Sequence, residues 1–288
     1  MRLRWLVCVA SGLVLTACAD LGAVSNLSQG MITAGETWNS VGDELPRSCA
    51  RTLQFNATVD CASSKDAAKA SAAATEVLLA YFQAIHDVAN ESNFTVQPGL
   101  DAVAGSVKDI PGVNADQAAA VAGLASTLAK LATEKLREDT LKRLIGEGAP
   151  HVTTVLSLLR ATVPRALGTT LSSERIAMQA AYASYIGAGG HALPSSCDPA
   201  PRVTDHSGET FLLAEDYCRR LVSLDAKVGS VKAYEASLAS VQKAMDDLQS
   251  DKARLSSKAL AQKLYETGKG LDQNLKAVRK AFGKETAA

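Results

Sequence analysis

The spacing of apolar residues in the last third of the chain constrains its fold most. From Tyr217 to Leu255, apolar side chains recur at alternating steps of three and four residues, with one polar gap at Lys252. This spacing places them on one face of a helix and is close to the heptad repeat of coiled coils. Some fifty residues of continuous helix would be about 75 Å long.

The stripe of apolar residues continues after a short interruption. It resumes at Leu260 and reaches Phe282, and the residue pair Ser256-Ser257 precedes it. A change of phase at these serines leaves two arrangements open, a bend in one helix or a separate returning helix.

The composition agrees with a helical protein. The 288 residues include 50 alanines and eight prolines, and only 5% are aromatic, which favours helices over strands. A hydrophobic content of 47% with zero net charge excludes a disordered chain. Thirty basic residues balance thirty acidic ones without a basic block, which argues against nucleic-acid binding. We therefore predict an all-α fold, an elongated antiparallel helical bundle with coiled-coil-like long C-terminal helices.

An amphipathic pattern also covers residues 23–45. Its apolar residues share one helical face, while Gly30, Gly35 and Gly42 lie off that face. We expect this helix to end at Pro46. A flexible tether is the alternative, because each glycine lowers helix propensity by about 1 kcal/mol.

Capping residues and apolar spacing place the remaining helices. Asn114 followed by Gln117 resembles a capping box, and we expect the helix that it begins to end at Gly146. Further helices are expected at about 63–93, 98–108, 150–164 and 172–186, and a last long stretch from about 207. Residues 187–206 form the longest loop, the candidate point of subdivision of a single helical-bundle domain over 18–288.

The N-terminus is typical of a signal peptide. Arg2 and Arg4 precede an apolar stretch from Trp5 to about Leu15, which is too short to span a bilayer. The stretch ends in Leu15-Thr16-Ala17-Cys18, which resembles the lipobox of bacterial lipoproteins.

The resemblance implies that residues 1–17 are removed and that Cys18 carries the lipid, including an acyl chain such as palmitate. Ala19, rather than aspartate, follows the cysteine, which implies an outer-membrane location facing the periplasm. An ordinary cysteine in a cleaved secretory signal is the alternative. The mature chain has 28 basic and 30 acidic residues, a net charge of −2, so the acyl chains and not surface charge would hold it to the membrane.

Four cysteines remain in the mature chain: Cys49, Cys61, Cys197 and Cys218. An even number in an exported protein suggests disulfides, and proximity favours the pairs 49–61 and 197–218. Each would contribute about 3 kcal/mol by constraining the unfolded chain. A metal site is the alternative, but no Cys-x-x-Cys pair is present.

The sequence contains no recognisable catalytic, metal or cofactor motif. The four histidines, His86, His151, His191 and His206, stand in no metal-binding or haem pattern. His86 is expected beside a helix face as a surface or boundary histidine, and a weak metal site in the loop with His191 and His206 is the less favoured alternative. Trp38 is expected in the core or at a membrane interface.

These observations predict a non-catalytic, lipid-anchored envelope protein that acts as an adaptor or scaffold. We expect it to contact a protein partner, with a homo-oligomer left open. One alternative is a bundle that binds a small apolar ligand or lipid in a cavity between the alanines of 67–74 and 118–120. The other is an enzyme of unrecognised class.

Overall fold

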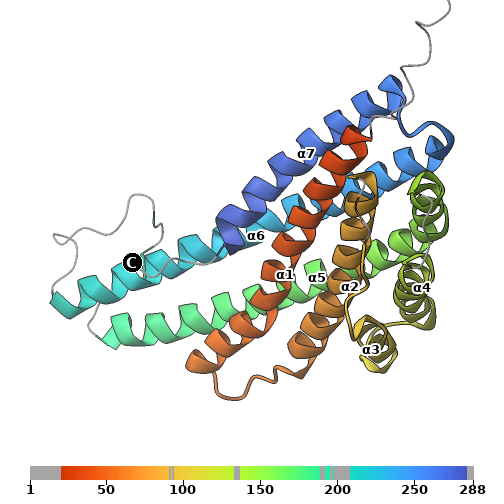
Figure 1. The fold of residues 1–288 in the computed structure, drawn as a ribbon. Coiled ribbons are helices and arrows are strands. Elements are labelled where there is room, and N and C mark those ends of the chain that lie inside the picture. The colour runs from red at the N-terminus through yellow and green to blue at the C-terminus, as the bar shows by residue number, and fades with distance from the viewer. Residues whose placement is uncertain are drawn as a thin grey trace, which may run out of the picture.

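The structure, a computed structural model, describes residues 21–90, 92, 94–132, 137–188, 192–194, 197 and 208–283, and of residues 137 and 138 the backbone only. Within these residues it contains seven α-helices, two short 3₁₀ turns and no strand (Figure 1). The predicted all-α helical bundle is confirmed. The signal peptide and Cys18 lie outside the described residues.

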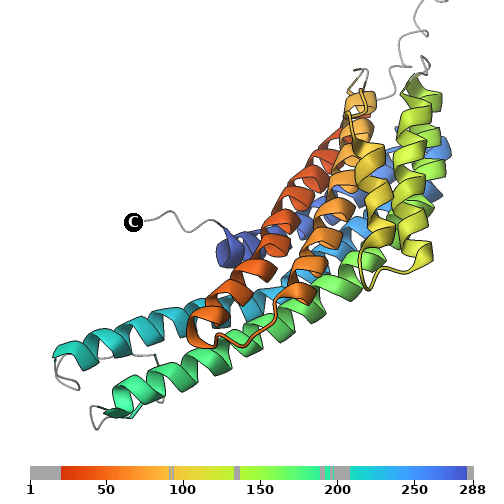
Figure 2. The ribbon, with the colours of Figure 1, turned by 90° about the horizontal axis from the view of Figure 1, so that it is seen from below.

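The helices follow one another as antiparallel neighbours (Figures 1 and 2). Their bounds are α1 Gly22–Phe55, α2 Ala62–Ala89, α3 Leu100–Ser106, η1 Val107–Asp109, α4 Ala115–Leu131, α5 Arg137–Ala188, α6 Gly208–Ser250, η2 Lys252–Arg254 and α7 Lys258–Phe282. The 52-residue α5 is about 78 Å long, and α6 returns along it. α7 then returns along α6 and covers part of α1.

Helix α1 lies at the centre of the core and packs against α2, α5 and α7. Trp38 is fully buried, and its indole Nε1 donates a hydrogen bond of 2.8 Å to the hydroxyl of Ser237 on α6. Its ring meets the edge of Tyr234 at 6.4 Å between centroids. The indole is therefore a core residue, and its expected alternative at a membrane interface is wrong.

The predicted end of the first helix at Pro46 is also wrong, because α1 continues to Phe55. A proline inside a helix costs about 3 kcal/mol through a lost hydrogen bond and a clash with the carbonyl four residues earlier. That carbonyl belongs to Gly42. Val41, Leu45 and Cys49, all buried, keep the apolar face continuous across the proline.

Gly35 and Gly42 do not lie on an outer face as expected but are buried against α2. A Cβ at Gly35 would lie 2.6 Å from Leu79 Cδ2, and one at Gly42 would lie 2.9 Å from Ser71 Oγ. These glycines allow the two helices to approach closely, so α1 has a second buried face and is no flexible tether.

The predicted helices between residues 114 and 186 have the wrong boundaries. The capping box of Asn114 and Gln117 is present, but α4 ends at Leu131. α5 then runs without a break through Gly146, Pro150 and Pro164, where three separate segments were expected. Its buried stripe continues on both sides of each proline, and burial of that stripe outweighs the local cost of the prolines.

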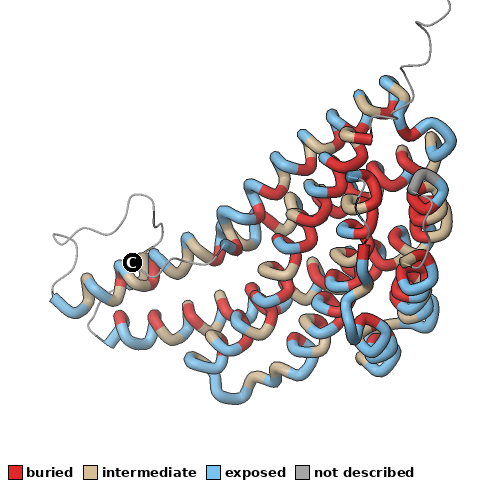
Figure 3. Tube along the Cα trace, viewed as in Figure 1, coloured by how far each residue is buried: buried red, intermediate tan, exposed pale blue. Residues whose placement is uncertain are grey.

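The end of the chain forms a separate returning helix. α6 ends at Ser250, and the hydroxyl of Ser257 accepts a hydrogen bond from the backbone N–H of Leu260 at the start of α7. The apolar stripe of α6 is buried where α7 covers it, but Val228, in the middle of α6, remains 48% exposed. Figure 3 shows this change from a buried interior to an exposed tip.

A buried group of four charged side chains joins α1, α5 and α6. Glu44 and Glu174 are each 6% exposed, and Arg51 bridges them by ion pairs to both carboxylates. Lys227 Nζ lies 2.9 Å from Glu44 Oε1, and Ser48 donates a hydrogen bond of 2.7 Å to Glu174 Oε2. Burial alone would lower the pKa of Arg51, but the two carboxylates outweigh it and raise the pKa. Two positive and two negative charges therefore balance inside the bundle.

Gly148 gives a test of the close packing between α5 and α2. A Cβ there would lie 2.3 Å from the ring of Tyr81, which is fully buried and fixed by a hydrogen bond of 2.9 Å to the carbonyl of Leu144. We predict that Gly148→Ala lowers the free energy of unfolding by about 1–3 kcal/mol, measured by urea denaturation. Gly168→Ala, in open space on the same helix, should instead raise it by up to about 1 kcal/mol. Equal effects would contradict this packing.

Arg51 gives a test of the buried charge group. Arg51→Met leaves Glu44 and Glu174 buried without their shared cation, so we predict a loss of about 3–5 kcal/mol in unfolding free energy. Arg47→Met is the control, because Arg47 and its partner Asp43 are 54% and 65% exposed. That change should stay within about 1 kcal/mol. If Arg51→Met lowers the free energy of unfolding no more than the control does, the charged group adds nothing to stability.

Candidate functional site

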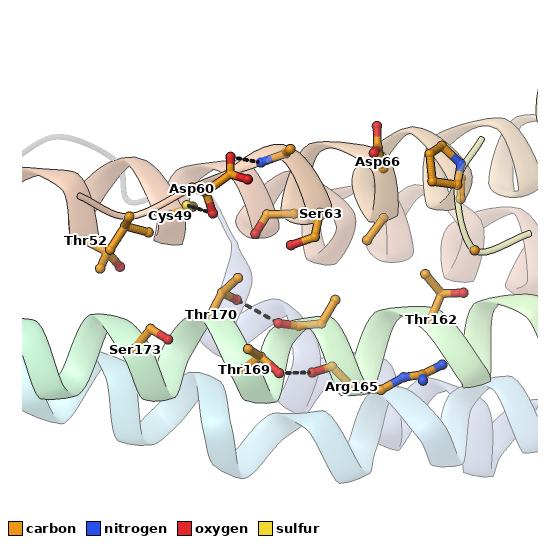
Figure 4. A pocket seen from close by; sticks show the side chains of 18 of the residues that line it. Cys49, Thr52, Asp60, Ser63, Asp66, Thr162, Arg165, Thr169, Thr170 and Ser173 are labelled. Carbon is orange, nitrogen blue, oxygen red and sulfur yellow. Dashed lines mark hydrogen bonds between the residues drawn. The ribbon is translucent and has the colours of Figure 1, made fainter. Parts of the chain in front are cut away.

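A hollow of about 670 Å³ lies between the start of α2, the end of α1 and the middle of α5 (Figure 4). Residues 111–113, between η1 and α4, contribute to its lining. An adjoining hollow of about 540 Å³ extends further along α5 and shares Thr52, Val59 and Ser173 with the first. We call the two together the α5 groove.

Small hydroxyl side chains line the first part of the α5 groove. They are Thr52, Ser63, Ser64, Thr162, Thr169, Thr170 and Ser173. Thr52, Thr169 and Thr170 donate to carbonyls one turn earlier on their own helices, at 2.9–3.1 Å. The hydroxyls of the other four make no hydrogen bond within the described protein. The groove thus combines free hydrogen-bonding groups with small side chains that leave space.

The second part of the groove is apolar. Phe55, Ile176, Ala177, Ala180 and Ala181 line it. Ile176 is 65% exposed, unusual for a large aliphatic side chain, and stands at the groove rather than in the core. Along α5, the groove therefore changes from hydroxyl-rich to apolar.

Three charged side chains lie at the hydroxyl-rich part. Asp60 Oδ1 accepts a hydrogen bond of 2.9 Å from the backbone N–H of Ala62, and Asp66 forms an ion pair of 3.7 Å with Lys69. Arg165, on the opposite wall, donates to the carbonyl of Ala161 at 3.1 Å. It has no carboxylate partner among the described residues. Asp60 likewise has no cationic partner among these residues, so the walls carry two carboxylates and one guanidinium.

The disulfides have the pairing that sequence proximity predicts. Cys49–Cys61 joins the end of α1 to the start of α2, with 5.8 Å between Cα atoms, and Cys49 lines the groove. Cys197–Cys218 ties the long connection to α6, with 5.2 Å between Cα atoms. Both therefore fix irregular segments next to exposed surface.

A second feature is the projecting pair of helix tips, residues 175–188 of α5 and 208–228 of α6, which we call the arm (Figures 1 and 2). Inside it, Tyr182 packs between Phe55 and Tyr217, with ring centroids 6.0 and 5.6 Å away. Tyr182 donates a hydrogen bond to Asp216, which also accepts from Arg220 at 2.8 Å. Burial, together with the hydrogen bond to Asp216, raises the pKa of Tyr182 to about 12.

Large apolar side chains on the outer surface of the arm are exposed to solvent. Tyr185 is 67% exposed, Leu212 63% and Val222 56%. Tyr185 and Leu212 lie near the tips, beyond the end of α1. Exposed tyrosine and aliphatic side chains are typical of surfaces that bind other proteins.

The remaining candidate residues from the sequence serve structural roles or lie outside the described part. His86 is half-buried, as expected of a boundary histidine, with Nδ1 3.1 Å from the carbonyl of Ser25. His151 packs against Gly123. In the part of the chain that the structure describes, no three His, Cys, Asp or Glu side chains gather as metal ligands. His191 and His206 are not in that part.

The alanines named for the expected cavity are divided between the core and the α5 groove. Ala73, Ala74 and Ala120 are buried in the core, while Ala67 and Ala70 line the α5 groove. Sequence reasoning missed the groove, because its other wall is a Thr162–Ala181 stripe of small side chains that matches no motif. The one available signal was an α5 face of mostly small side chains, on which Arg165 and Ile176 are the exceptions.

None of the described helices has an apolar stretch long enough to cross a bilayer.

The raised pKa of Tyr182 predicts how the free energy of unfolding changes at alkaline pH. Because its folded pKa of about 12 exceeds the value of about 10 in the unfolded chain, its contribution is present below pH 10 and is lost as pH rises through 12. We predict that Tyr182→Phe makes the loss of unfolding free energy between about pH 9 and about pH 11 smaller than in wild type. Urea denaturation at both pH values measures it. Tyr185→Phe, at an exposed position, should keep the wild-type loss, and a wild-type loss in both variants would refute the prediction.

Comparison of the chain with models of known protein families, with curated proteins and with solved structures finds no match in any of the three. Function is therefore inferred from the residues themselves.

Proposed function

We propose that this chain is a lipoprotein of the bacterial cell envelope that acts without catalysis, as an adaptor or scaffold. Lipid on Cys18 would hold it in the outer membrane, facing the periplasm. The arm would contact a protein partner, which is another envelope protein or a second copy of the chain. The lipobox supports the proposed lipid anchor, and the position of the arm supports the proposed contact with a protein partner.

The observation that supports it best is the separation of the two ends of the bundle. α1 begins at Gly22, four residues after Cys18, and its start lines a hollow with residues 261–269 of α7. The arm tip lies at the other end of α6, which has 43 residues and is about 65 Å long (Figures 1 and 2). A chain anchored through Cys18 would thus present its arm far from the point of attachment.

The surface of the arm suits a protein contact. Its exposed aromatic and aliphatic side chains would lose contact with water in a complex, and each buried apolar Å² contributes about 25 cal/mol. The Cys197–Cys218 disulfide and the packing of Tyr182 hold the arm in one shape before binding, which lowers the entropy that binding must overcome.

The proposal is tested by photo-crosslinking in cells. A photoreactive amino acid at position 185 or 212 should give a crosslinked product of higher mass, because both side chains face outward on the arm. In the Cys18→Ser background the protein should leave the membrane fraction, and the crosslinked product should fall at least about fivefold, since membrane attachment raises the local concentration of an envelope partner.

Position 265 is the matched control. Tyr265 is as exposed as Tyr185, at 67%, but lies on α7 near the anchored end. Crosslinking at 265 and not on the arm would overturn the arm as the contact surface. A Cys18→Ser protein that stays in the membrane fraction would overturn the lipid anchor.

A further inference from the structure

We infer that the solvent-facing side of α7 is a membrane-contact surface, which lies on a bilayer that contains anionic phospholipids. The inference rests on the proposed lipid anchor and deepens it, because it names the chemistry of the lipid surface that the anchored chain contacts. The surface is separate from the arm and from the α5 groove. Contact through α7 would fix the orientation of the bundle on the membrane, which a lipid on Cys18 alone does not.

The first observation is a line of exposed side chains along α7. Lys258, Lys269, Lys276 and Lys280 are all exposed. With 3.6 residues per turn, these four lysines lie within about 40° of one another around the helix axis, and Tyr265 lies on the same line. We call these five residues the α7 stripe. Figure 3 shows that one side of α7 is exposed along its length.

The second observation is an uneven distribution of charge over the molecule. Six basic and two acidic residues give α7 a net charge of +4. The rest of the mature chain has 22 basic and 28 acidic residues, a net charge of −6. The overall net charge of −2 therefore conceals a basic face, to which anionic head groups are attracted.

The third observation is the position of α7 beside the anchored end. A Cβ at Gly268 would lie 4.0 Å from Leu27 Cδ1, and one at Gly30 would lie 3.9 Å from Leu271 Cδ2. The two helices therefore run side by side in the same direction (Figure 1). The start of α1 is four residues after Cys18, at most about 14 Å of extended chain. The lipid would thus enter the bilayer close to the start of α7.

Tyr265 gives the stripe a side chain that suits the membrane interface. It is 67% exposed and, together with Lys269, lines a hollow of about 500 Å³ at the start of α1. Tyrosine is enriched where bilayers meet water, because its ring is apolar and its hydroxyl is polar. Lysine side chains reach the same level of the bilayer through their ammonium groups. The composition of the stripe therefore matches a head-group region.

Three carboxylates on or near the stripe oppose the attraction to anionic lipid. Asp272 pairs with Lys276 at 2.7 Å and lies 3.5 Å from Arg279, so two cations share one carboxylate. Glu266 on α7 and Glu36 on α1 are exposed. The four lysines of the stripe and Arg279 outnumber these three acids, so the face keeps a net positive charge.

The test uses the lipidated full chain in vesicles, with a tryptophan that reports contact with lipid. Tyr265→Trp places the reporter in the stripe, and Tyr185→Trp, at an equally exposed position on the arm, is the matched control. Trp38, the other tryptophan of the mature chain, is fully buried and gives a constant background. Brominated phosphatidylcholine quenches the fluorescence of a tryptophan that reaches the bilayer.

The vesicles contain one half brominated phosphatidylcholine and one half either phosphatidylglycerol or ordinary phosphatidylcholine. In Tyr265→Trp, quenching should be at least about twofold stronger with phosphatidylglycerol, because anionic head groups attract the stripe. Raising the salt concentration from about 0.1 M to about 0.5 M should remove this difference by screening. In Tyr185→Trp, quenching should be the same in both kinds of vesicle.

Two fourfold variants of the Tyr265→Trp chain test the lysines themselves. The first combines Lys258→Gln, Lys269→Gln, Lys276→Gln and Lys280→Gln, and it should quench no more with phosphatidylglycerol than without. The control changes four exposed lysines outside α7 and should quench like its parent. Its changes are Lys65→Gln, Lys69→Gln, Lys108→Gln and Lys232→Gln. Both variants lose four positive charges, so they differ only in where the charges are lost, and thermal melting confirms that each is folded.

Three results would overturn the inference. They are quenching in Tyr265→Trp that does not depend on phosphatidylglycerol, equal quenching of the two reporters, and equal effects of the two fourfold variants. Flotation with vesicles of pure phosphatidylcholine separates these results from a failure of the anchor. A chain that floats but gives any of the three keeps its lipid anchor and loses only the contact surface. A chain that does not float has no lipid anchor, which overturns the proposed attachment and this inference with it.

Discussion

The burial of α1 on nearly all sides is the constraint on which the rest of the bundle depends. Apart from an exposed stripe that includes Glu36, Asp43 and Arg47, neighbouring helices cover α1. A helix covered in this way must place small residues where neighbours approach and must satisfy the polar groups that it buries. Gly35 and Gly42 meet the first requirement on the side of α2. The Trp38–Ser237 hydrogen bond and the ion pairs of Arg51 meet the second toward α6 and α5. Because these contacts connect segments that are far apart in sequence, they fix the order in which the later helices surround α1.

The limits of sequence reasoning are clearest at prolines and glycines. The periodicity of α1, α2, α6 and α7 predicts those helices well, since long apolar stripes are strong signals. Pro46 and Gly146 were expected to end helices and Pro150 to begin one, but all three lie inside helices, because local propensity is worth about 1–3 kcal/mol and the burial of a continuous stripe is worth more. The continuity of those stripes across the prolines is evident only when the neighbouring helices that bury them are known.

The candidate site was harder to predict than the fold. Cysteine spacing predicts both disulfides, because each of these four cysteines has one other that is close to it in the sequence. The α5 groove has no such signal. Its small side chains, such as Ala166 and Thr169, look like ordinary helix surface. The groove is a product of tertiary packing, formed where α1 ends and the connection to α2 turns away from α5.

The Cys49–Cys61 disulfide links the core to this groove. Cys49 is buried in α1 one turn past the proline, and Cys61 stands just before α2, so the bond fixes the start of α2 relative to the most buried helix. The backbone N–H groups of Ser63 and Ser64 come soon after Cys61 in the chain, so the disulfide fixes their positions as well. Across the gap, Glu174 holds α5 to α1 through Arg51, one residue beyond Ser173 of the groove. Both walls are therefore attached to α1 by strong and buried contacts, and the groove between them keeps its shape without a ligand, a condition that favours tight binding of a small molecule.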